Sequence, residues 1–169
     1  MDSIFLSDNR EYICPKCKKG VLEYRDHCKR IVRHEGGEAE WIHIPRHKCS
    51  NERCRKLHRL LPDFLAPFKH YEEEVICDSI DDRIKPEESD YCPSERTVSH
   101  WKFWLWLNTD DINGYMKSIA FRELGYSEEL LKSGVSLLDK LRSSMPDGWL
   151  KIIIRTIYNS GASLRPFYT

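Results

Sequence analysis

The chain has 169 residues, of which 40% are hydrophobic and 32% charged, and its 27 Lys+Arg balance its 27 Asp+Glu. This composition predicts a folded protein of one domain or two small ones, and it excludes long disorder and large catalytic scaffolds. No apolar run reaches the roughly 18 to 20 residues of a membrane span, and the first residues lack a signal-peptide pattern, so we expect a cytoplasmic protein without membrane contact. Seven cysteines, an odd number, favour metal binding over a disulfide framework in a reducing compartment.

The zero net charge hides a strong polarity along the chain. Residues 1–60 carry a net charge of +5 and five of the seven histidines, residues 61–92 carry −7, and residues 93–169 carry +2. A basic N-terminal part is compatible with nucleic-acid binding, although runs of charge are also common on ordinary solvated faces.

Two close cysteine pairs dominate the basic part. Cys14 and Cys17 are followed by Gly20, which we expect to take the positive φ of a tight knuckle, and Cys49 and Cys54 form a second pair after a gap of 31 residues. Pairs with two to four intervening residues present both sulfurs to one ion, so the sequence predicts one structural Zn²⁺ ion in a closed Cys₄ site. Two alternatives remain open. One of three nearby histidines, His27, His47 or His58, could replace a cysteine, or Cys28 could be an additional ligand.

The gap between the pairs has the composition of a β-hairpin. The segments 21–24, 30–33 and 41–44 are rich in β-forming residues, and Gly36-Gly37 supplies a turn. We expect the hairpin to be an arm of a zinc ribbon. The knuckles and the arm carry cations that could bind DNA phosphates: Lys16, Lys18, Lys19, Arg30, Arg33 and Arg46.

Helical periodicity begins after a proline-containing stretch. Residues 69–82 predict an amphipathic helix that buries Val75 and Ile76 and exposes an acidic face including Glu73. Ser94 is expected to cap a second helix, 95–107, whose first turns project side chains that could enter a DNA major groove: Arg96, Ser99, His100 and Lys102. Its aromatic run, Trp101 to Leu107, is instead typical of a buried core.

Three more helices are predicted at 112–124, 127–143 and 148–159, with Ser127 as the cap of the second and the Asp110-Asp111 pair at the start of the first. Cys77 and Cys92 are expected to be buried among the helices. The fold class is therefore α+β, a zinc ribbon at 1–62 followed by an all-α part at 63–169 that contains a helix-turn-helix-like unit, 69–107, and C-terminal helices, 112–159.

The order of a Cys-Pro-x-Cys knuckle, a hairpin arm, a Cys-x₄-Cys knuckle, the segment 55–64 and a Ser-Glu-Arg-Thr-Val-Ser-x-Trp helix resembles one family. It is similar to the DUF6431-type zinc-ribbon and helix-turn-helix region of transposase-related proteins of Firmicutes. This resemblance covers residues 11–107 and implies Cys14, Cys17, Cys49 and Cys54 as metal ligands. It also implies Arg96, Ser99, His100 and Lys102 as DNA contacts.

The function expected from these features is zinc-dependent binding of double-stranded DNA, in an accessory or regulatory factor of a mobile element. The 62 residues after residue 107 are too few for a metal-dependent nuclease domain, and no catalytic motif is present, so we expect no enzyme and name no catalytic residue. The C-terminal helices could dimerise the protein or dock a partner. The alternative is a zinc-stabilised protein-interaction adaptor that uses the acidic helix or the aromatic helices.

Overall fold

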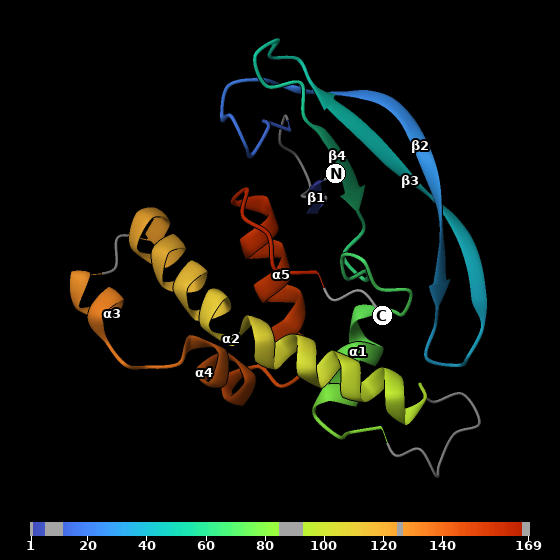
Figure 1. Ribbon diagram of the computed structural model, residues 1–169, viewed down its shortest axis with the longest axis vertical. Coiled ribbons are helices and arrows are strands. Elements are labelled where there is room, and N and C mark those ends of the chain that lie inside the picture. Colours follow the sequence, from blue (N-terminus) through green and yellow to red (C-terminus); the bar gives the residue numbers. More distant parts are fainter. Residues whose placement is uncertain (1, 6–11, 85–92, 125–126, 167–169) are drawn as a thin grey trace.

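The computed structural model describes residues 2–5, 12–84, 93–124 and 127–166. It is an α+β fold in which one four-stranded sheet lies beside a group of helices (Figure 1). The strands are β1 (Asp2–Phe5), β2 (Leu22–Arg33), β3 (Ala39–Cys49) and β4 (Leu57–Leu61), in the spatial order β1-β4-β3-β2. Among the strand pairs in the described residues, β1 and β4 are parallel, and the other two pairs are antiparallel.

The predicted hairpin is confirmed and is longer than the sequence pattern indicated. β2 and β3 pair along their whole length and form a two-stranded ribbon whose turn contains Gly37 at φ 78. The register shifts between Tyr24 and Asp26, which leaves Arg25 as an extra residue in β2. Such a bulge increases the local twist, and the ribbon accordingly curves along one side of the molecule (Figure 1).

The pleat of the ribbon gives it two different faces. Val32 and Ile44 point inward and are buried in the main hydrophobic core with the helices. At the other end of the sheet, Leu22, Cys49 and Leu60 belong to a second, smaller core around the cysteine knuckles. Residues of the sheet therefore contribute to two hydrophobic clusters, one with the helices and one around the knuckles.

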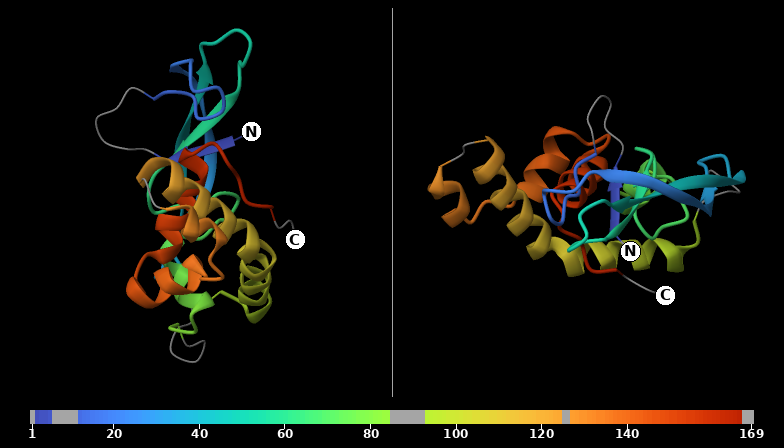
Figure 2. Two further views of the ribbon diagram at one scale, coloured as in Figure 1. Left: turned by 90° about the vertical axis from the view of Figure 1, so that its left-hand side faces the viewer. Right: turned by 90° about the horizontal axis from the view of Figure 1, so that it is seen from above.

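The described helices are α1 (Glu73–Ile80), α2 (Glu95–Leu124), α3 (Glu128–Lys132), α4 (Leu137–Ser144) and α5 (Trp149–Asn159). In the view from above, the tip of the ribbon and α3 lie at opposite ends of the molecule (Figure 2). The predicted cap of the second helix is confirmed, since Ser94 Oγ accepts a hydrogen bond from the backbone N–H of Thr97 at 3.3 Å. The last predicted helix is confirmed as α5.

The division of residues 95–124 into two helices is wrong. α2 is continuous through the polar run at 108–111, so the Asp110-Asp111 pair lies inside the helix and caps nothing. The reason is tertiary: Asn108 is fully buried, its amide donates to the carbonyls of Trp104 and Arg165, and its Oδ1 accepts the N–H of Arg165. These hydrogen bonds satisfy the buried amide of Asn108, a polar residue that the sequence pattern interprets as the end of a helix.

Four smaller expectations about the helices are also wrong. The helix predicted at 127–143 is two helices, α3 and α4, which are separated by residues 133–136, and α4 has its own cap because Ser136 Oγ accepts from the N–H of Asp139. Ser127 precedes α3 without a side-chain capping bond. Helix α1 is shorter than predicted, and Glu73, expected on its exposed face, is only 4% exposed.

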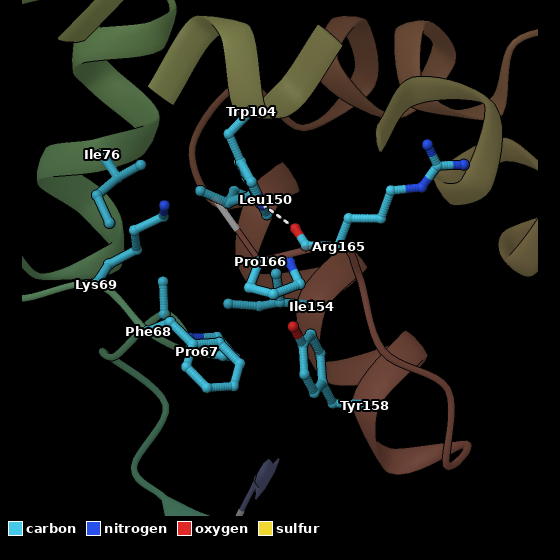
Figure 3. A pocket seen from close by; sticks show the side chains of 11 residues that line it. Pro67, Phe68, Lys69, Ile76, Trp104, Leu150, Ile154, Tyr158, Arg165 and Pro166 are labelled. Atoms are coloured by element: carbon cyan, nitrogen blue, oxygen red, sulfur yellow. Dashed lines mark hydrogen bonds between the residues drawn. The ribbon is translucent and has the colours of Figure 1, made fainter. Parts of the chain in front are cut away.

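The aromatic run of α2 is buried on one side only. Trp101 and Trp104 lie in the core, whereas Phe103 and Trp106 are 45% and 69% exposed, which corrects the expectation that the whole run is buried. Figure 3 shows Trp104 beside the C-terminal segment, where its indole N–H donates to the carbonyl of Arg165 at 3.0 Å. The cavity between Trp104 and this C-terminal segment measures about 10 Å³, which is room for one water molecule at most, so it is a packing gap.

The main core joins residues of the sheet to residues of the helices, with α5 at its centre. Phe5 of β1, Leu61 of β4 and Ile153 of α5 belong to the same buried cluster. Among the helices that the structure describes, none is long and apolar enough to cross a membrane.

Candidate metal centre

The four predicted ligands meet between two loops at the upper end of the sheet (Figure 1). In both loops the residue after the second cysteine is left-handed: Lys18 has φ 56 and Arg55 has φ 48. This turn lets the N–H of Lys18 donate to the carbonyl of Cys14 at 2.8 Å, and the N–H of Arg55 donate to the carbonyl of Asn51 at 2.9 Å. The two knuckles therefore have similar local geometry in spite of their different spacings.

Gly20 serves the knuckle in a different way from the one predicted. Its φ is not positive, because Lys18 makes the turn. A Cβ at Gly20 would lie 2.4 Å from the Sγ of Cys49 and 2.8 Å from the backbone N of Asn51. Glycine is required here because the first knuckle passes directly against the second.

The four sulfur atoms lie close enough together to hold one metal ion. All four Sγ atoms lie within 4.8 Å of one another. Cys14 Sγ is 3.8 Å from Cys54 Sγ, and Cys17 Sγ is 3.6 Å from Cys49 Sγ. A tetrahedral ion with Zn–S bonds of about 2.3 Å requires sulfur atoms about 3.8 Å apart. The four thiols therefore fit a structural metal ion, which would supply folding free energy, and four sulfur ligands would leave it no open position for catalysis.

The surroundings of the thiols differ from one cysteine to another. Burial raises the pKa of Cys14 and raises the pKa of Cys49 to about 12, which favours the neutral thiol at both positions as long as no cation is bound. The backbone N–H groups of Gly20 and Lys19 lower the pKa of Cys17 to about 6. The Gly20 N–H donates to Cys17 Sγ at 3.4 Å, a contact that holds this sulfur in place within the first knuckle.

The alternative ligands occupy different places. His58 is fully buried, and its Nε2 lies 3.3 Å from Cys14 Sγ, a distance at which a proton on Nε2 would be donated to the sulfur and would orient it. His47 packs between the rings of Tyr12 and Tyr24, and the ring of His27 contacts that of His43. The cluster thus has four cysteines, with His58 as an outer contact that spacing arguments could not single out.

The remaining cysteines lie away from the cluster. Cys28 is half-buried against the main core and Cys77 is buried on α1, as expected, whereas Cys92 lies outside the described residues. The six cysteines in the described ranges are all free thiols.

The first knuckle is anchored on the end of α5, which sequence reasoning missed. Gly161 has φ 92, and a Cβ there would lie 2.4 Å from the carbonyl oxygen of Pro15. Lys18 Nζ donates to the carbonyl of Ser160 at 3.0 Å, and Asn159 Oδ1 accepts the N–H of Phe5 at 2.8 Å. The Gly-Ala pair after α5 was the only available signal, and its partner is more than 140 residues away in the chain.

The basic residues predicted to hold phosphates have unequal freedom. Lys16 and Lys19 are exposed, and Lys18, also exposed, makes the contact to Ser160. Arg30 donates to the carbonyls of Ala66 and Lys69, and burial lowers its pKa to about 10. It holds the ribbon against the segment that leads to α1.

Two further arginines also have partners within the fold. The guanidinium of Arg46 is paired with the carboxylate of Asp26 on the neighbouring strand. Arg33, at the tip of the ribbon, lies over the ring of Tyr71 at 5.8 Å.

The first turns of α2 carry the four residues that were predicted to contact DNA bases. Arg96 and Ser99 are exposed, His100 is half-buried, and Lys102 is paired with Asp82. The segment that joins α1 to α2 includes residues 85–92, which lie outside the described part of the chain, so the helix-turn-helix unit stays a prediction. The two sets do not form one surface: the knuckle lysines lie at one end of the sheet and α2 begins near the other (Figure 1).

These features define a class of protein in which a four-cysteine knuckle pair supports a β-ribbon that packs on a helical layer. The sequence matches the domain of unknown function DUF6431 over residues 14–101, more than half of the chain, and the protein belongs to that family. The matched region runs from the first cysteine ligand to the first turns of α2. No curated protein and no solved structure matches the chain.

Proposed function

We propose that the protein is a zinc-dependent DNA-binding protein in which the metal holds cationic loops on the surface and a duplex is bound through its phosphates. Cys14, Cys17, Cys49 and Cys54 would hold one structural zinc ion. No chemical step is part of the proposal, because the ion would serve the fold alone.

The observation that carries the proposal is the charge of the knuckles. Residues 14–20 and 49–56 contain a single carboxylate, Glu52, and six cationic side chains, and all seven charged side chains are exposed. The cations are Lys16, Lys18, Lys19, Arg53, Arg55 and Lys56. One zinc ion with four thiolates carries a charge of −2, so the knuckles remain positive when the metal is bound. Exposed cations held by a rigid loop are the groups that replace counterions on DNA phosphates.

Sequence discrimination would come from the first turns of α2. Arg96 and Ser99 are the exposed candidates there, since Lys102 is paired with Asp82. A helix of this kind reads base edges in a major groove. The wider proposal, a role beside a mobile element, rests on the resemblance to transposase-related proteins and predicts that the selected sequence occurs at the ends of such an element.

The test is the selection of bound duplexes from a random pool at near-physiological salt, with zinc-loaded protein and again after chelation. We expect a motif that disappears with the metal. Chelation would also remove the contribution of the metal to the fold, so variants are needed to separate the two effects. Lys56→Ala should reduce the slope of log affinity against log salt by about 1, and Arg96→Ala should relax the motif. Lys140→Ala, an exposed lysine on α4, is the matched control. Equal effects of Lys56→Ala and Lys140→Ala would refute a role of the knuckles.

A second candidate function is the protein-interaction adaptor, and one observation favours it. The rings of Phe103 and Trp106 lie 5.4 Å apart on the exposed side of α2, which is typical of an interface anchor. A partner whose binding survives high salt and is lost in Trp106→Ala, together with no retention on DNA, would select the adaptor.

A further inference from the structure

The outer face of the ribbon carries a row of exposed rings that the metal centre does not use. We call Tyr24, His27, Trp41 and His43 the ring strip. The register pairs His27 with Pro45 and Ile31 with Trp41, and it places Lys29 opposite His43. These residues point away from the helices, because their neighbours Cys28, Ile42 and Ile44 face the main core.

The strip is open to solvent and continuous with the knuckles. Trp41 and Tyr24 are 64% and 62% exposed. The ring of Tyr24 contacts that of His47 at 5.7 Å, and its hydroxyl lies 3.4 Å from Nδ1 of His27, whose ring is 4.6 Å from that of His43. Tyr12, which precedes the first knuckle, packs on the other side of His47.

The charge of this face is one-sided. The carboxylates of the two strands are Glu23, Asp26 and Glu40, and the register pairs Asp26 with Arg46 and Glu40 with Val32 on the inner face. Glu23 lies opposite Lys48 in the strand register. The ring strip contains two imidazoles and no carboxylate, and Lys29 lies opposite His43 on the neighbouring strand, so a polyanion meets no carboxylate along the strip.

We propose that the ring strip binds single-stranded nucleic acid by stacking unpaired bases on Trp41 and Tyr24. This inference deepens the proposed function, on which it rests for the phosphate contacts of the knuckles. Stacking on aromatic side chains is sequence-tolerant and contributes about 1–3 kcal/mol per base.

The spacing of the rings favours an unpaired strand over a duplex. Residues on one face of a strand repeat every 6.6 Å or so, which is about twice the 3.4 Å rise per nucleotide in one strand of a duplex. Bases inside a duplex already stack on each other and offer no free face to a protein ring. From Tyr24 to Trp41 the strip extends over about 20 Å, enough for several splayed bases.

The experiment measures binding of short oligothymidine and oligouridine strands, which cannot pair with themselves, by fluorescence anisotropy of a label on the strand. Trp41→Ala should weaken binding at least about fivefold, which corresponds to the lower end of the stacking free energy, and Trp41→Phe should restore most of it. Trp106→Ala is the control, since that indole is equally exposed on α2. Affinity for a duplex should change less than twofold in Trp41→Ala. Comparison of the affinities for oligothymidine and oligouridine shows whether the natural ligand is single-stranded DNA or RNA.

Three outcomes would overturn the inference. The first is that zinc-loaded protein does not bind either strand, and the second is that Trp41→Ala and Trp106→Ala weaken binding equally. The third is a self-associating protein that Trp41→Ala converts to a monomer without oligonucleotide binding, which would assign the strip to a second copy of the chain. Failure of the proposed function looks different: Lys56→Ala and Arg96→Ala leave duplex binding unchanged, whatever Trp41→Ala does to single strands.

Discussion

Substitution of Gly20 by alanine tests whether the close approach of the knuckles determines metal affinity. The added Cβ would lie 2.4 Å from Cys49 Sγ, whereas ordinary van der Waals contact begins at 3.4 Å, so the sulfur or the first knuckle must move by about 1 Å. The backbone of Asn51, at 2.8 Å, blocks a compensating shift in that direction. Zinc–sulfur bonds tolerate about 0.2 Å, and loss of an outer contact alone costs about 10-fold to 100-fold in affinity, so we expect at least that loss.

The assay is competition for zinc against a chromophoric chelator, together with the absorption of the Co²⁺-loaded protein, which reports the number of thiolate ligands. Gly36→Ala is the matched control, because a Cβ at Gly36 in the ribbon turn meets no atom within 4 Å. We expect Gly36→Ala to bind metal like the parent and Gly20→Ala to show weaker affinity and an altered spectrum. A Gly20→Ala protein with parental affinity and four thiolate ligands would refute this reasoning.

Three further predictions concern the fold that supports the site. Burial raises the pKa of Glu73 from 4.5 to about 7, so the parent protein loses stability as the pH rises through this range. The Glu73→Gln variant should therefore be more stable than the parent at pH 8, by up to about 3 kcal/mol, with no such gain at pH 4. Urea unfolding at the two pH values measures this, and a pH-independent difference would contradict it. Gly161→Ala should lower the unfolding free energy by at least about 1 kcal/mol, because of its φ of 92 and the contact with Pro15, while cobalt still binds through four thiolates; parental stability would disprove the anchor. Asn108→Leu should cost about 1–3 kcal/mol, because it leaves the N–H of Arg165 without its acceptor, and thermal unfolding with unchanged stability would argue against that role.

The ligand set and the ribbon could be predicted from the sequence because their signals are local. A pair of cysteines two or four residues apart can present both sulfurs to one ion, and β-forming residues around Gly36-Gly37 pair with their neighbours in the chain. The family match begins at Cys14 and includes both of these features. The end helix, with Gly148 before it and isoleucines on one face, was predictable for the same reason.

Other predictions failed where a distant residue determines the outcome. Asn108 looks like a helix break until the backbone of Arg165 satisfies its amide, and Glu73 looks exposed until α1 packs. Arg30 looks like a phosphate ligand, but its guanidinium is bound to the carbonyls of Ala66 and Lys69.

The sequence by itself therefore determined which residues could hold a metal and which segments pair as a ribbon. Only the tertiary structure decided which cations stay free, where Gly20 and Gly161 must lack a side chain, and which rings remain exposed. The physical reason is that spacing and periodicity describe neighbours along the chain. Burial, hydrogen bonding and close approach depend on partners that folding brings together from far apart in the chain.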